Sequence, residues 1–594
     1  MSRFQPCRRA WHTVRDSTRP AGLALLVLAC VLPLRTAGAE VEVELAGVDA
    51  EIRTNIRASL DLVRHGSRTD LSEAAVRRLY ARARGQIRDA MRPFGYYHPR
   101  IERSLEQRDG RWFASFEIEP GEPILVAEID ARVSGDGSAE ERLQQVIADS
   151  PIQVGRPLRH FEHDRLRNDL QAAATTLGYF EARFMERKLE VDPAALTARV
   201  VLHLETGPRY HFGAIEASQD ILDEELFQKF VAIRTGEPFD AGRLLQVQYR
   251  LTDSLYFASV IVHAGEPDAA TRTVPVEIET SPTRRQRIRL GLGYATDTRL
   301  RGSVAVDWRH LNKAGHSAGT ELRLSENLSE ISGRYRIPIG DPLKERLLFR
   351  GGYTQEDLAD LESRRALLGV SHVTDRGGGW QRTLFTDLLD ERTRAPDQPE
   401  QRDRLIIPGI GMEKLIADNV LFPSKGYRLR GEVRGSHQVL GANSDFLRLD
   451  FEANRVDSLG EHWRFFTRSR IGLGIVGGFE TLPASQRFFA GGDQSVRGYG
   501  FNSLGPRDEL GNVIGGRHLV FGSLEAERRV WGRVALAAFV DAGNALDSLD
   551  DGLEASVGLG VNVHTPIGTL RIAMARSVTE GRSPRFHLTI RPDL

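Results

Sequence analysis

The sequence predicts an α+β region followed by an all-β region: three β-α-α-β-β units, then a 16-stranded transmembrane β-barrel. Similar segments recur at intervals of about 80 residues between residues 40 and 285, which is long enough for a small domain in each interval. From residue 287 onward, short segments alternate apolar and polar side chains up to the C-terminal end. The length of 594 residues also exceeds what a single hydrophobic core supports.

The composition excludes several classes of protein. The chain is 41% hydrophobic and 27% charged, with a mean hydropathy of −0.33. Beyond residue 40, no stretch approaches the roughly 18 consecutive apolar residues that a membrane-spanning helix requires. The net charge of −1 provides no basic surface on a global scale, so nucleic acid is not expected as a partner.

Residues 1–39 have the features of a secretory signal peptide. A region with several Arg residues precedes the apolar run 21–34, and small residues at 37–39 suit a cleavage site. A membrane anchor is the alternative, but the apolar run is short for a span. Both cysteines, Cys7 and Cys30, lie in this segment, so the exported chain would have no disulfide, thiol catalyst or Cys-ligated metal.

The three N-terminal units share two markers. The first marker is an aromatic corner that opens a strand, and the second is a strand that ends near a proline. The corners are Phe94-Gly95-Tyr96-Tyr97, Leu177-Gly178-Tyr179-Phe180 and Ser254-Leu255-Tyr256-Phe257. The strand exits are Phe116–Gly121, Leu204–Pro208 and Ile278–Pro282.

Each unit is predicted to begin with a short strand, continue with two helices and end with two strands. In the second unit, helical spacing of apolar residues covers 139–148 and 161–176, and alternating strands cover 182–189 and 198–204. This order resembles the POTRA domain, whose open sheet edge can accept an added strand. The expected domains are 40–121, 122–208 and 209–283; generic α+β spacers are the alternative.

The C-terminal region, expected over 287–594, consists of strands with one apolar and one polar face. Ile288, Leu290, Leu292 and Tyr294 share one face of segment 287–295, and the same alternation occurs in 554–565 and 585–591. Sixteen such segments can be marked, at about 19 residues per strand and loop, which is typical of an outer-membrane barrel. A soluble β-sandwich is the alternative; the export signal and the amphipathic last strand argue against it.

The long segment 477–516, between the eleventh and twelfth strands, contains Val496-Arg497-Gly498-Tyr499 within Phe488–Tyr499. This motif resembles the loop of the BamA/TamA superfamily of outer-membrane assembly factors and two-partner secretion pores. Further stretches resemble the same superfamily, and together with the order of elements they extend the resemblance over the whole exported chain. These stretches are Ala417–Gly426, Gly522–Glu525, Phe539–Gly543 and His564–Gly568.

The resemblance implies that this loop folds back into the barrel lumen and that Arg497 pairs with acidic residues on the inner wall. The alternation in strands 519–528 and 534–543 turns Glu525 and Asp541 inward, where a guanidinium can form charge-assisted bonds with both. We expect Gly498 to allow a tight backbone turn and Tyr499 to pack on the wall. An ordinary extracellular loop with a surface Arg is the alternative.

Within the superfamily, three POTRA-like units and a barrel resemble the TamA branch, the translocation and assembly module subunit. The resemblance implies a protein in the bacterial outer membrane with periplasmic POTRA domains. It would help autotransporters and other unfolded barrel clients to insert into the lipid bilayer, with a TamB-like inner-membrane-anchored partner. A BamA-like general insertase or a two-partner-secretion pore is the alternative.

The expected mechanism is a weak lateral seam between the first and last strands, where a client strand could pair. Glycines on the inner face of the first strand and a proline after the last strand motivate this hypothesis. The predicted seam residues are Gly291, Gly293, Phe586, Leu588, Ile590 and Pro592. The ending Arg591-Pro592-Asp593-Leu594 lacks the terminal aromatic residue common in outer-membrane proteins.

No enzyme activity is expected, and no cofactor or metal. An outer-membrane hydrolase would need a Ser/His/acid or paired-carboxylate site, and the sequence has no G-x-S-x-G elbow and no helical His pair at metal spacing. A passive conduit shares the barrel and the Arg497 loop. It differs in expected behaviour, since a conduit should show stable conductance and one dedicated secreted partner.

Overall fold

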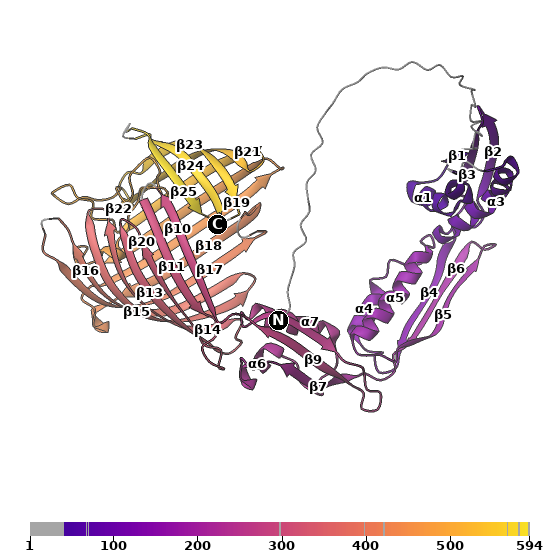
Figure 1. The fold of residues 1–594 in the computed structure, drawn as a ribbon, viewed down its shortest axis with the longest axis horizontal. Coiled ribbons are helices and arrows are strands. Elements are labelled where there is room, and N and C mark those ends of the chain that lie inside the picture. The colour runs from indigo at the N-terminus through magenta and orange to yellow at the C-terminus, as the bar shows by residue number, and fades with distance from the viewer. Residues whose placement is uncertain are drawn as a thin grey trace, which may run out of the picture. The chain divides into compact units, whose positions relative to one another are not determined.

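A computed structural model describes residues 41–66, 68, 71–295, 299–396, 398–419, 422–566, 568–579 and 583–591 (Figure 1). The expected signal peptide 1–39 and Pro592 lie outside these residues. None of the described helices combines the length and apolar composition that crossing a membrane requires. Two compact units are present: the first holds repeat 1 and part of repeat 2, and the second holds the rest of repeat 2, repeat 3 and the barrel.

Repeat 1 is a three-stranded sheet covered by helices. Its sheet has the order β1-β3-β2, with β1 parallel and β2 antiparallel to the central β3. The central strand alternates strictly, so Trp112, Phe116 and Ile118 all point into the helical layer and are buried. Its elements are β1 (Val41–Ala46), α1 (Ala50–Ser59), α2 (Asp61–His65), α3 (Glu73–Met91), η1 (Arg92–Phe94), β2 (Arg100–Arg108) and β3 (Arg111–Glu119).

Repeat 1 has three α-helices where the sequence predicted two. Leu60 takes an extended backbone conformation (φ −78°, ψ 118°) and is fully buried, and this interrupts the helix between α1 and α2. Side chains cap the other helix starts: Asp49 accepts from the Ile52 amide at 2.9 Å, and Ser72 accepts from the Ala75 amide. The chain therefore buries the Leu60 side chain in the core and does not continue as one helix from α1 into α2.

Repeats 2 and 3 have sheets of the same order, β4-β6-β5 and β7-β9-β8. In repeat 3 the core is aromatic, with Phe227 and Phe230 of α6 in one buried cluster with Phe212 and Phe239. The elements of repeat 2 are β4 (Leu125–Ser134), α4 (Glu141–Ala148), α5 (His160–Thr176), β5 (Arg183–Asp192) and β6 (Thr197–Glu205). Those of repeat 3 are β7 (His211–Ser218), α6 (Glu224–Val231), α7 (Ala241–Asp253), β8 (Phe257–Ala264) and β9 (Thr273–Pro282).

The aromatic corner has the same backbone conformation in all three repeats. Gly95 and Gly178 have φ values of +88° and +85°, in the left-handed region that glycine tolerates best. At the same place in repeat 3 stands Leu255, with φ +69°. A leucine in this conformation costs roughly 1–2 kcal/mol, so the corner geometry is kept even without glycine.

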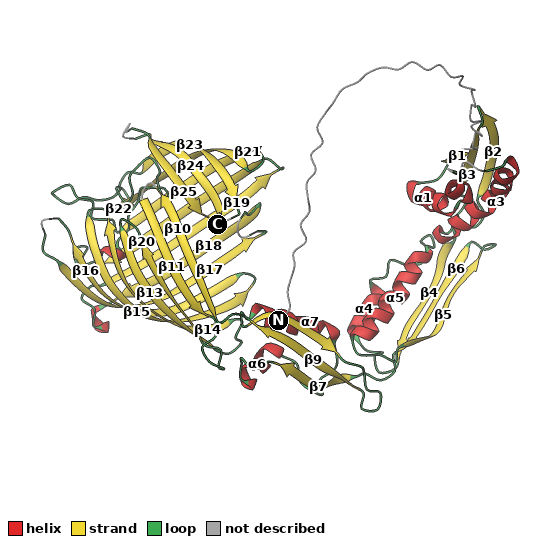
Figure 2. Cartoon of the chain, in the orientation of Figure 1, coloured by secondary structure: helices red, strands yellow, loops and turns green. Residues whose placement is uncertain are grey.

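The barrel is one 16-stranded antiparallel sheet in which every strand pairs with the next along the chain (Figures 1 and 2). This confirms the predicted fold class: POTRA-like units followed by a 16-stranded barrel. The strands of the first half are β10 (Gln286–Ala295), β11 (Arg299–Trp308), β12 (Ser317–Leu324), β13 (Leu328–Pro338), β14 (Glu345–Leu358), β15 (Leu361–Gly377), β16 (Trp380–Arg394) and β17 (Gln401–Ala417). Those of the second half are β18 (Lys425–Ser436), β19 (Phe446–Leu459), β20 (Trp463–Val476), β21 (His518–Trp531), β22 (Val534–Leu546), β23 (Glu554–Thr565), β24 (Gly568–Ser577) and β25 (Arg585–Arg591).

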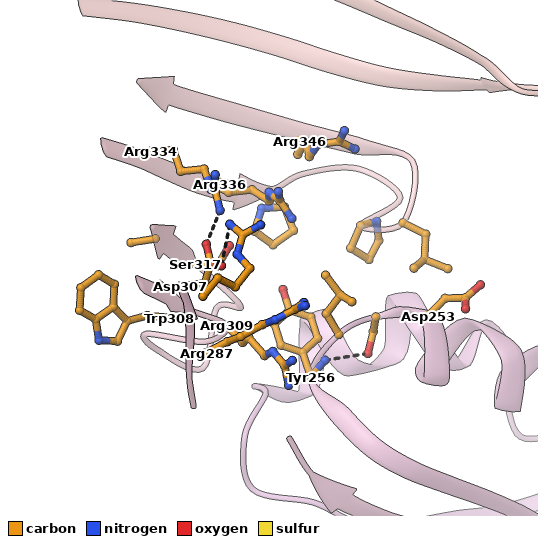
Figure 3. A pocket seen from close by; sticks show the side chains of 17 residues that line it. Asp253, Tyr256, Arg287, Asp307, Trp308, Arg309, Ser317, Arg334, Arg336 and Arg346 are labelled. Atoms are coloured by element: carbon orange, nitrogen blue, oxygen red, sulfur yellow. Dashed lines mark hydrogen bonds and ion pairs between the residues drawn. The ribbon is translucent and has the colours of Figure 1, made fainter. Parts of the chain in front are cut away.

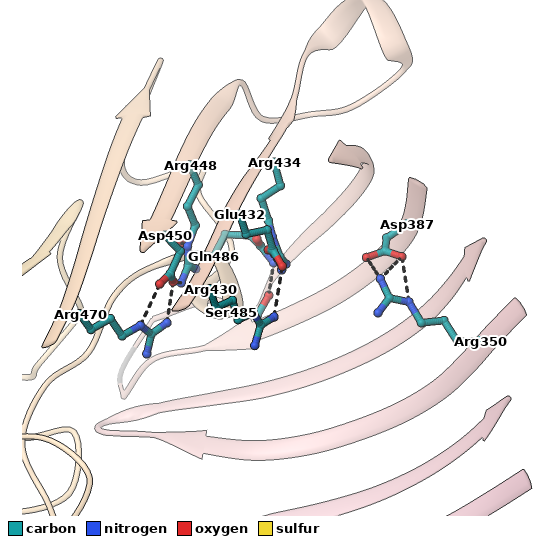
Figure 4. Close-up of polar contacts among 10 residues, drawn as sticks. All are labelled: Arg350, Asp387, Arg430, Glu432, Arg434, Arg448, Asp450, Arg470, Ser485 and Gln486. Atoms are coloured by element: carbon teal, nitrogen blue, oxygen red, sulfur yellow. Dashed lines mark hydrogen bonds and ion pairs between the residues drawn. The ribbon is translucent and has the colours of Figure 1, made fainter. Parts of the chain in front are cut away.

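The two faces of the barrel wall differ in chemistry. Apolar side chains at alternate positions are exposed on the outside, as for Leu292 (91% exposed) and Leu559 (70%). Charged side chains on the inner face pair with one another between strands. Arg350 holds both carboxylate oxygens of Asp387, and Arg470 holds Asp450 (Figure 4). An apolar exterior and an ion-paired interior are the arrangement that a membrane barrel requires.

The third repeat contacts the barrel directly, within the same compact unit. The Tyr256 hydroxyl donates to the Gly315 carbonyl oxygen at 2.6 Å, and the Asp223 amide donates to the Lys313 carbonyl at 2.9 Å. Arg250 forms an ion pair with Asp341 at 3.0 Å. These contacts all reach turns between barrel strands, so repeat 3 lies at the strand ends opposite the long β20–β21 loop.

Candidate functional site

The connection between β20 and β21, residues 477–517, is folded and largely buried. Three isolated bridges, Phe488–Gly516, Ala490–Leu504 and Arg507–Val513, hold it against itself. Val496 and Tyr499 are almost fully buried in an apolar cluster that also includes side chains of β21 and β22. The segment therefore returns to the inner wall instead of extending from the rim.

Arg497 lies at the centre of this contact with the wall. Its guanidinium donates to both carboxylate oxygens of Asp541, at 2.8 Å each, and to Glu525 at 2.7 Å. Its main-chain amide adds a bond to Asp541 at 3.1 Å. All three residues are nearly inaccessible to solvent, so these are buried, charge-assisted bonds.

Neighbouring side chains complete the site around Arg497. The ring of Phe539 faces the guanidinium, with 3.2 Å between the Arg497 Cζ and the ring centre. Ser523 accepts from Arg497 at 3.3 Å, and Asn562 donates to the second oxygen of Glu525 at 3.3 Å. The loop is thus bound through its Arg497 cation, which contacts two carboxylates and an aromatic ring of β21 and β22.

The residues on either side of Arg497 fit the wall closely. Gly498 does not have a left-handed φ; instead, a Cβ there would lie 2.6 Å from the Ser556 Cβ and 2.7 Å from the Ser577 amide nitrogen. Its role is thus close approach to the wall, whereas the sequence suggested a tight turn. The Tyr499 hydroxyl donates to Glu554 and accepts from Ser577 at 2.7 Å.

The first part of the same loop contacts a different region of the wall. Ser485 donates through its amide to Glu391 of β16 at 3.0 Å, and its hydroxyl bonds the same carboxylate. Arg448 of β19 donates to the Gln486 carbonyl at 3.1 Å (Figure 4). The loop therefore contacts β16 and β19 as well as β21–β25, and it spans the lumen between them.

The first and last strands, β10 and β25, are the ends of the described sheet. β10 is paired only with β11, and β25 only with β24 in the described part of the chain. The two strands nevertheless contact each other. Gly291 and Gly293 lie on the inner face of β10, where a Cβ would meet the side chains of Ser303 and Arg301. Phe586 and Ile590 are exposed on the outer face of β25 with half-buried Leu588; Pro592 is outside the described residues.

Sequence reasoning missed two groups of residues near the site. His587 of β25 donates from its Nε2 to the Arg497 carbonyl at 2.6 Å. At the next inward position of β21 after Glu525, Arg464 and His564 both contact the buried Glu527, at 2.8 and 3.1 Å. Strand alternation turns His587 and Glu527 inward, but their partners follow only from the loop path and the strand register.

The side chains of the site attach the loop to the inner wall of the barrel. Within the described residues, no group of three or more His, Cys, Asp or Glu side chains could hold a metal ion. The carboxylates of the site accept hydrogen bonds from Arg497 and its neighbours. The arrangement is a braced loop beside two end strands, each of which has one hydrogen-bonded neighbour in the described sheet.

Comparison with known proteins identifies both regions. The Omp85 superfamily domain matches residues 283–590, and the first POTRA domain of TamA matches residues 42–120. The chain is 25% identical over 320 residues to the outer membrane protein assembly factor BamA of Nitratidesulfovibrio vulgaris, covering 50% of this chain and 40% of that protein. It is 27% identical over 183 residues to BamA of Neorickettsia risticii, covering 28% of this chain and 24% of that protein.

The chain thus spans less than half the length of these curated relatives. Among solved structures, BamA from Haemophilus ducreyi lacking POTRA domains 1–3 superposes with a TM-score of 0.66 at 15% identity. The superposition covers 78% of this chain and 99% of that structure. This likeness shows a shared fold.

Proposed function

Because this chain belongs to the Omp85 superfamily, we propose that it is an outer-membrane factor that helps unfolded β-barrel proteins, autotransporters among them, to insert into the bilayer. It acts without enzymatic chemistry, through a lateral seam between β10 and β25. The POTRA-like repeats extend into the periplasm, where unfolded clients arrive.

The observation that carries this proposal is the pair of strand edges. In the described sheet each of the two end strands has a hydrogen-bonded neighbour on one side only. Unpaired backbone groups are costly in lipid, so an edge beside the bilayer favours pairing with an added strand. A client strand that pairs with β10 would satisfy that edge and begin its own sheet.

The strands at the seam and beside it are also shorter than those on the far side of the barrel. β10 has 10 residues and β25 has 7, while β15 and β17 each have 17. A short wall matches a thinner hydrocarbon layer, and thinning of the bilayer lowers the barrier to insertion. The geometry therefore favours insertion at the seam.

The anchored loop favours an insertase over a secretion conduit. Residues 477–517 contact opposite parts of the inner wall, through Ser485 at β16 and Arg497 at β21 and β22. A chain passing along the lumen would have to displace these buried ion pairs. A client that enters through the seam leaves them intact.

Two features favour the TamA branch over a general BamA-like role. The chain has three POTRA-like repeats, and the first is similar to the first POTRA domain of TamA. On this basis we propose a TamB-like, inner-membrane-anchored periplasmic partner that contacts the first repeat. Its free strand edges, β1 and β2, offer backbone groups for such a contact.

The test is a disulfide lock across the seam. A cysteine pair, one from 288–292 and one from 586–590, is introduced into the exported chain, whose only natural cysteines, Cys7 and Cys30, lie in residues 1–39. The protein is placed in liposomes and the folding rate of an added autotransporter barrel is followed. We expect oxidation to abolish the acceleration and reduction to restore it.

A second pair, between paired residues of β11 and β12 such as Val304 and Leu322, controls for the oxidation itself. Acceleration that survives the seam lock contradicts the proposed route. If the protein conducts ions or passes a secreted chain and never accelerates insertion, the conduit function replaces the insertase.

A further inference from the structure

A cavity of about 470 Å³ lies where repeat 3 meets the inner wall of the barrel (Figure 3). One side is formed by the corner Asp253–Tyr256 of repeat 3, and the other by the ends of β10–β14 with their connecting turns. Trp308, Tyr256 and Leu343 provide an apolar part of the lining. The cavity is separate from the loop site, and it shares the strand β10 with the seam.

The lining is strongly basic. Two acidic side chains, Asp253 and Asp307, face an excess of arginines from several strands. Strand alternation places these arginines on the inner face, because their neighbours Ile288, Leu290 and Tyr335 are exposed outside. The arginines are Arg287, Arg289, Arg309, Arg334, Arg336 and Arg346.

Within the described residues, only two of these arginines form an ion pair with a carboxylate. Asp307 forms ion pairs with Arg289, at 3.1 Å, and with Arg334. The other four have no ion pair within the described part of the chain. The Nε of Arg336 is also buried, and it has no hydrogen-bond partner among the described residues. Such a donor is costly to leave unsatisfied.

We propose that this cavity binds a phosphate-bearing anion with at least two negative charges. Guanidinium groups match phosphate oxygens in pairs, and several of them around one site exceed what a single carboxylate would neutralise. The volume is in the range of small-molecule sites. The apolar part of the lining holds whatever group carries the phosphates.

The ligand would join repeat 3 to the first strand of the seam. Arg287 lies on β10, Arg336 on β13, and the Tyr256 corner belongs to repeat 3. The arginines of the barrel strands repel one another across the cavity, and a polyvalent anion reverses that effect. Ligand binding therefore ties β10 to β13 and β14 beside the Tyr256 corner of repeat 3.

The experiment uses the full exported chain in detergent micelles, with pyrophosphate as the probe and calorimetric titration at low salt. Arg336→Gln/Arg346→Gln is the test variant. Arg430→Gln is the matched control, an inner-wall arginine outside this cavity that bonds Glu432 at 3.2 Å. We expect the Kd of the test variant to rise at least tenfold, the control to be unchanged, and added salt to weaken binding.

A second measurement protects against a variant that fails to fold. Pyrophosphate should raise the Tm of the natural chain, and sulfate, a divalent anion of different shape, should do so less. The proposal is overturned if pyrophosphate does not bind, if the test variant binds it as the control does, or if only an acidic peptide such as hexaglutamate binds through these arginines.

A third measurement shows whether the phosphate belongs to a lipid headgroup or to a soluble compound. The chain is placed in phosphatidylcholine nanodiscs with or without phosphatidic acid. If phosphatidic acid competes with pyrophosphate, the cavity takes an anionic lipid headgroup. If it does not compete and pyrophosphate still binds, the ligand is a soluble phosphate compound. Both results support a phosphate-binding site. They differ in whether a lipid headgroup or a soluble compound occupies it.

Discussion

The imidazole Nε2 of His587 lies 2.6 Å from the main-chain carbonyl oxygen of Arg497. This bond joins the last strand of the barrel to the loop that Arg497 anchors on β21 and β22. Tyr499 extends the contact to β23 and β24 through Glu554 and Ser577. The loop thus braces the last five strands, which form one side of the seam.

Replacing His587 with alanine should loosen β25. The lost bond leaves the Arg497 carbonyl without its imidazole donor, which costs about 1 kcal/mol and raises local opening roughly fivefold. Amide hydrogen exchange of residues 585–591 measures this opening. Thr589→Val, at the next inward position of the same strand, is the control. Equal exchange in both variants would show that the imidazole does not hold the strand.

Arg497→Ala should release the loop from the wall. Removing one partner of a buried ion pair costs about 3–5 kcal/mol, because Asp541 and Glu525 remain buried and uncompensated. Arg497→Lys should recover only part of this, since an ammonium group cannot bond both carboxylates in the same forked geometry. Limited proteolysis of 477–517 measures the release.

The matched control is Arg364→Gln, which breaks the partly exposed pair with Glu362 on one strand. Such a pair contributes about 0–1 kcal/mol, so the loop should stay protected. The altered electrophoretic mobility of the unboiled barrel confirms folding in each variant. A loop that resists protease equally in Arg497→Ala and the control contradicts the anchoring role.

Much of the barrel could be predicted from the sequence, because strand alternation is a local property. The same rule that exposes Leu524 and Leu536 turns Glu525 and Asp541 inward, and the structure places both acids there. The repeat order followed from recurring markers for the same reason. Lipid on one side and a wet lumen on the other impose a strict period of two.

Other features could not be predicted, because they depend on contacts between distant segments. The contact of Ser485 with β16 spans 94 residues of chain, and that of His587 with the loop spans 90. The extra helix break at Leu60 depends on burial in the repeat core. Gly498 was expected to allow a tight turn, whereas the structure requires its close approach to Ser556 and Ser577.

Gly498→Ala should displace the loop although the φ of Gly498 lies outside the left-handed region. The added Cβ meets the Ser577 amide at 2.7 Å, and backbone atoms cannot move aside cheaply. Gly552→Ala is the control: it lies in the nearby β22–β23 turn, where a Cβ meets nothing within 4 Å. We expect proteolysis of 477–517 to rise only in Gly498→Ala. Equal protection in the two variants would rule out a steric role for Gly498.

The junction between repeat 3 and the barrel should weaken at high pH through Tyr256. Burial raises the pKa of Tyr256 to about 12, against the opposing effect of the Arg336 charge. In the unfolded chain this tyrosine deprotonates near pH 10. Its contribution to stability is therefore fully present below pH 10 and is lost as the pH rises toward 12, by roughly 2–3 kcal/mol in total.

Tyr256→Phe isolates this effect, because the other titrating groups are the same in both proteins. At pH 8 the variant should be less stable by about 1 kcal/mol, since the Gly315 carbonyl loses its 2.6 Å hydroxyl donor. Between pH 10 and 12 the difference should shrink and then change sign, because phenylalanine has no proton to lose. Thermal unfolding of both proteins at pH 8, 10 and 11 measures this trend. A difference that stays constant with pH would mean that the Tyr256 hydroxyl is not held protonated by the junction.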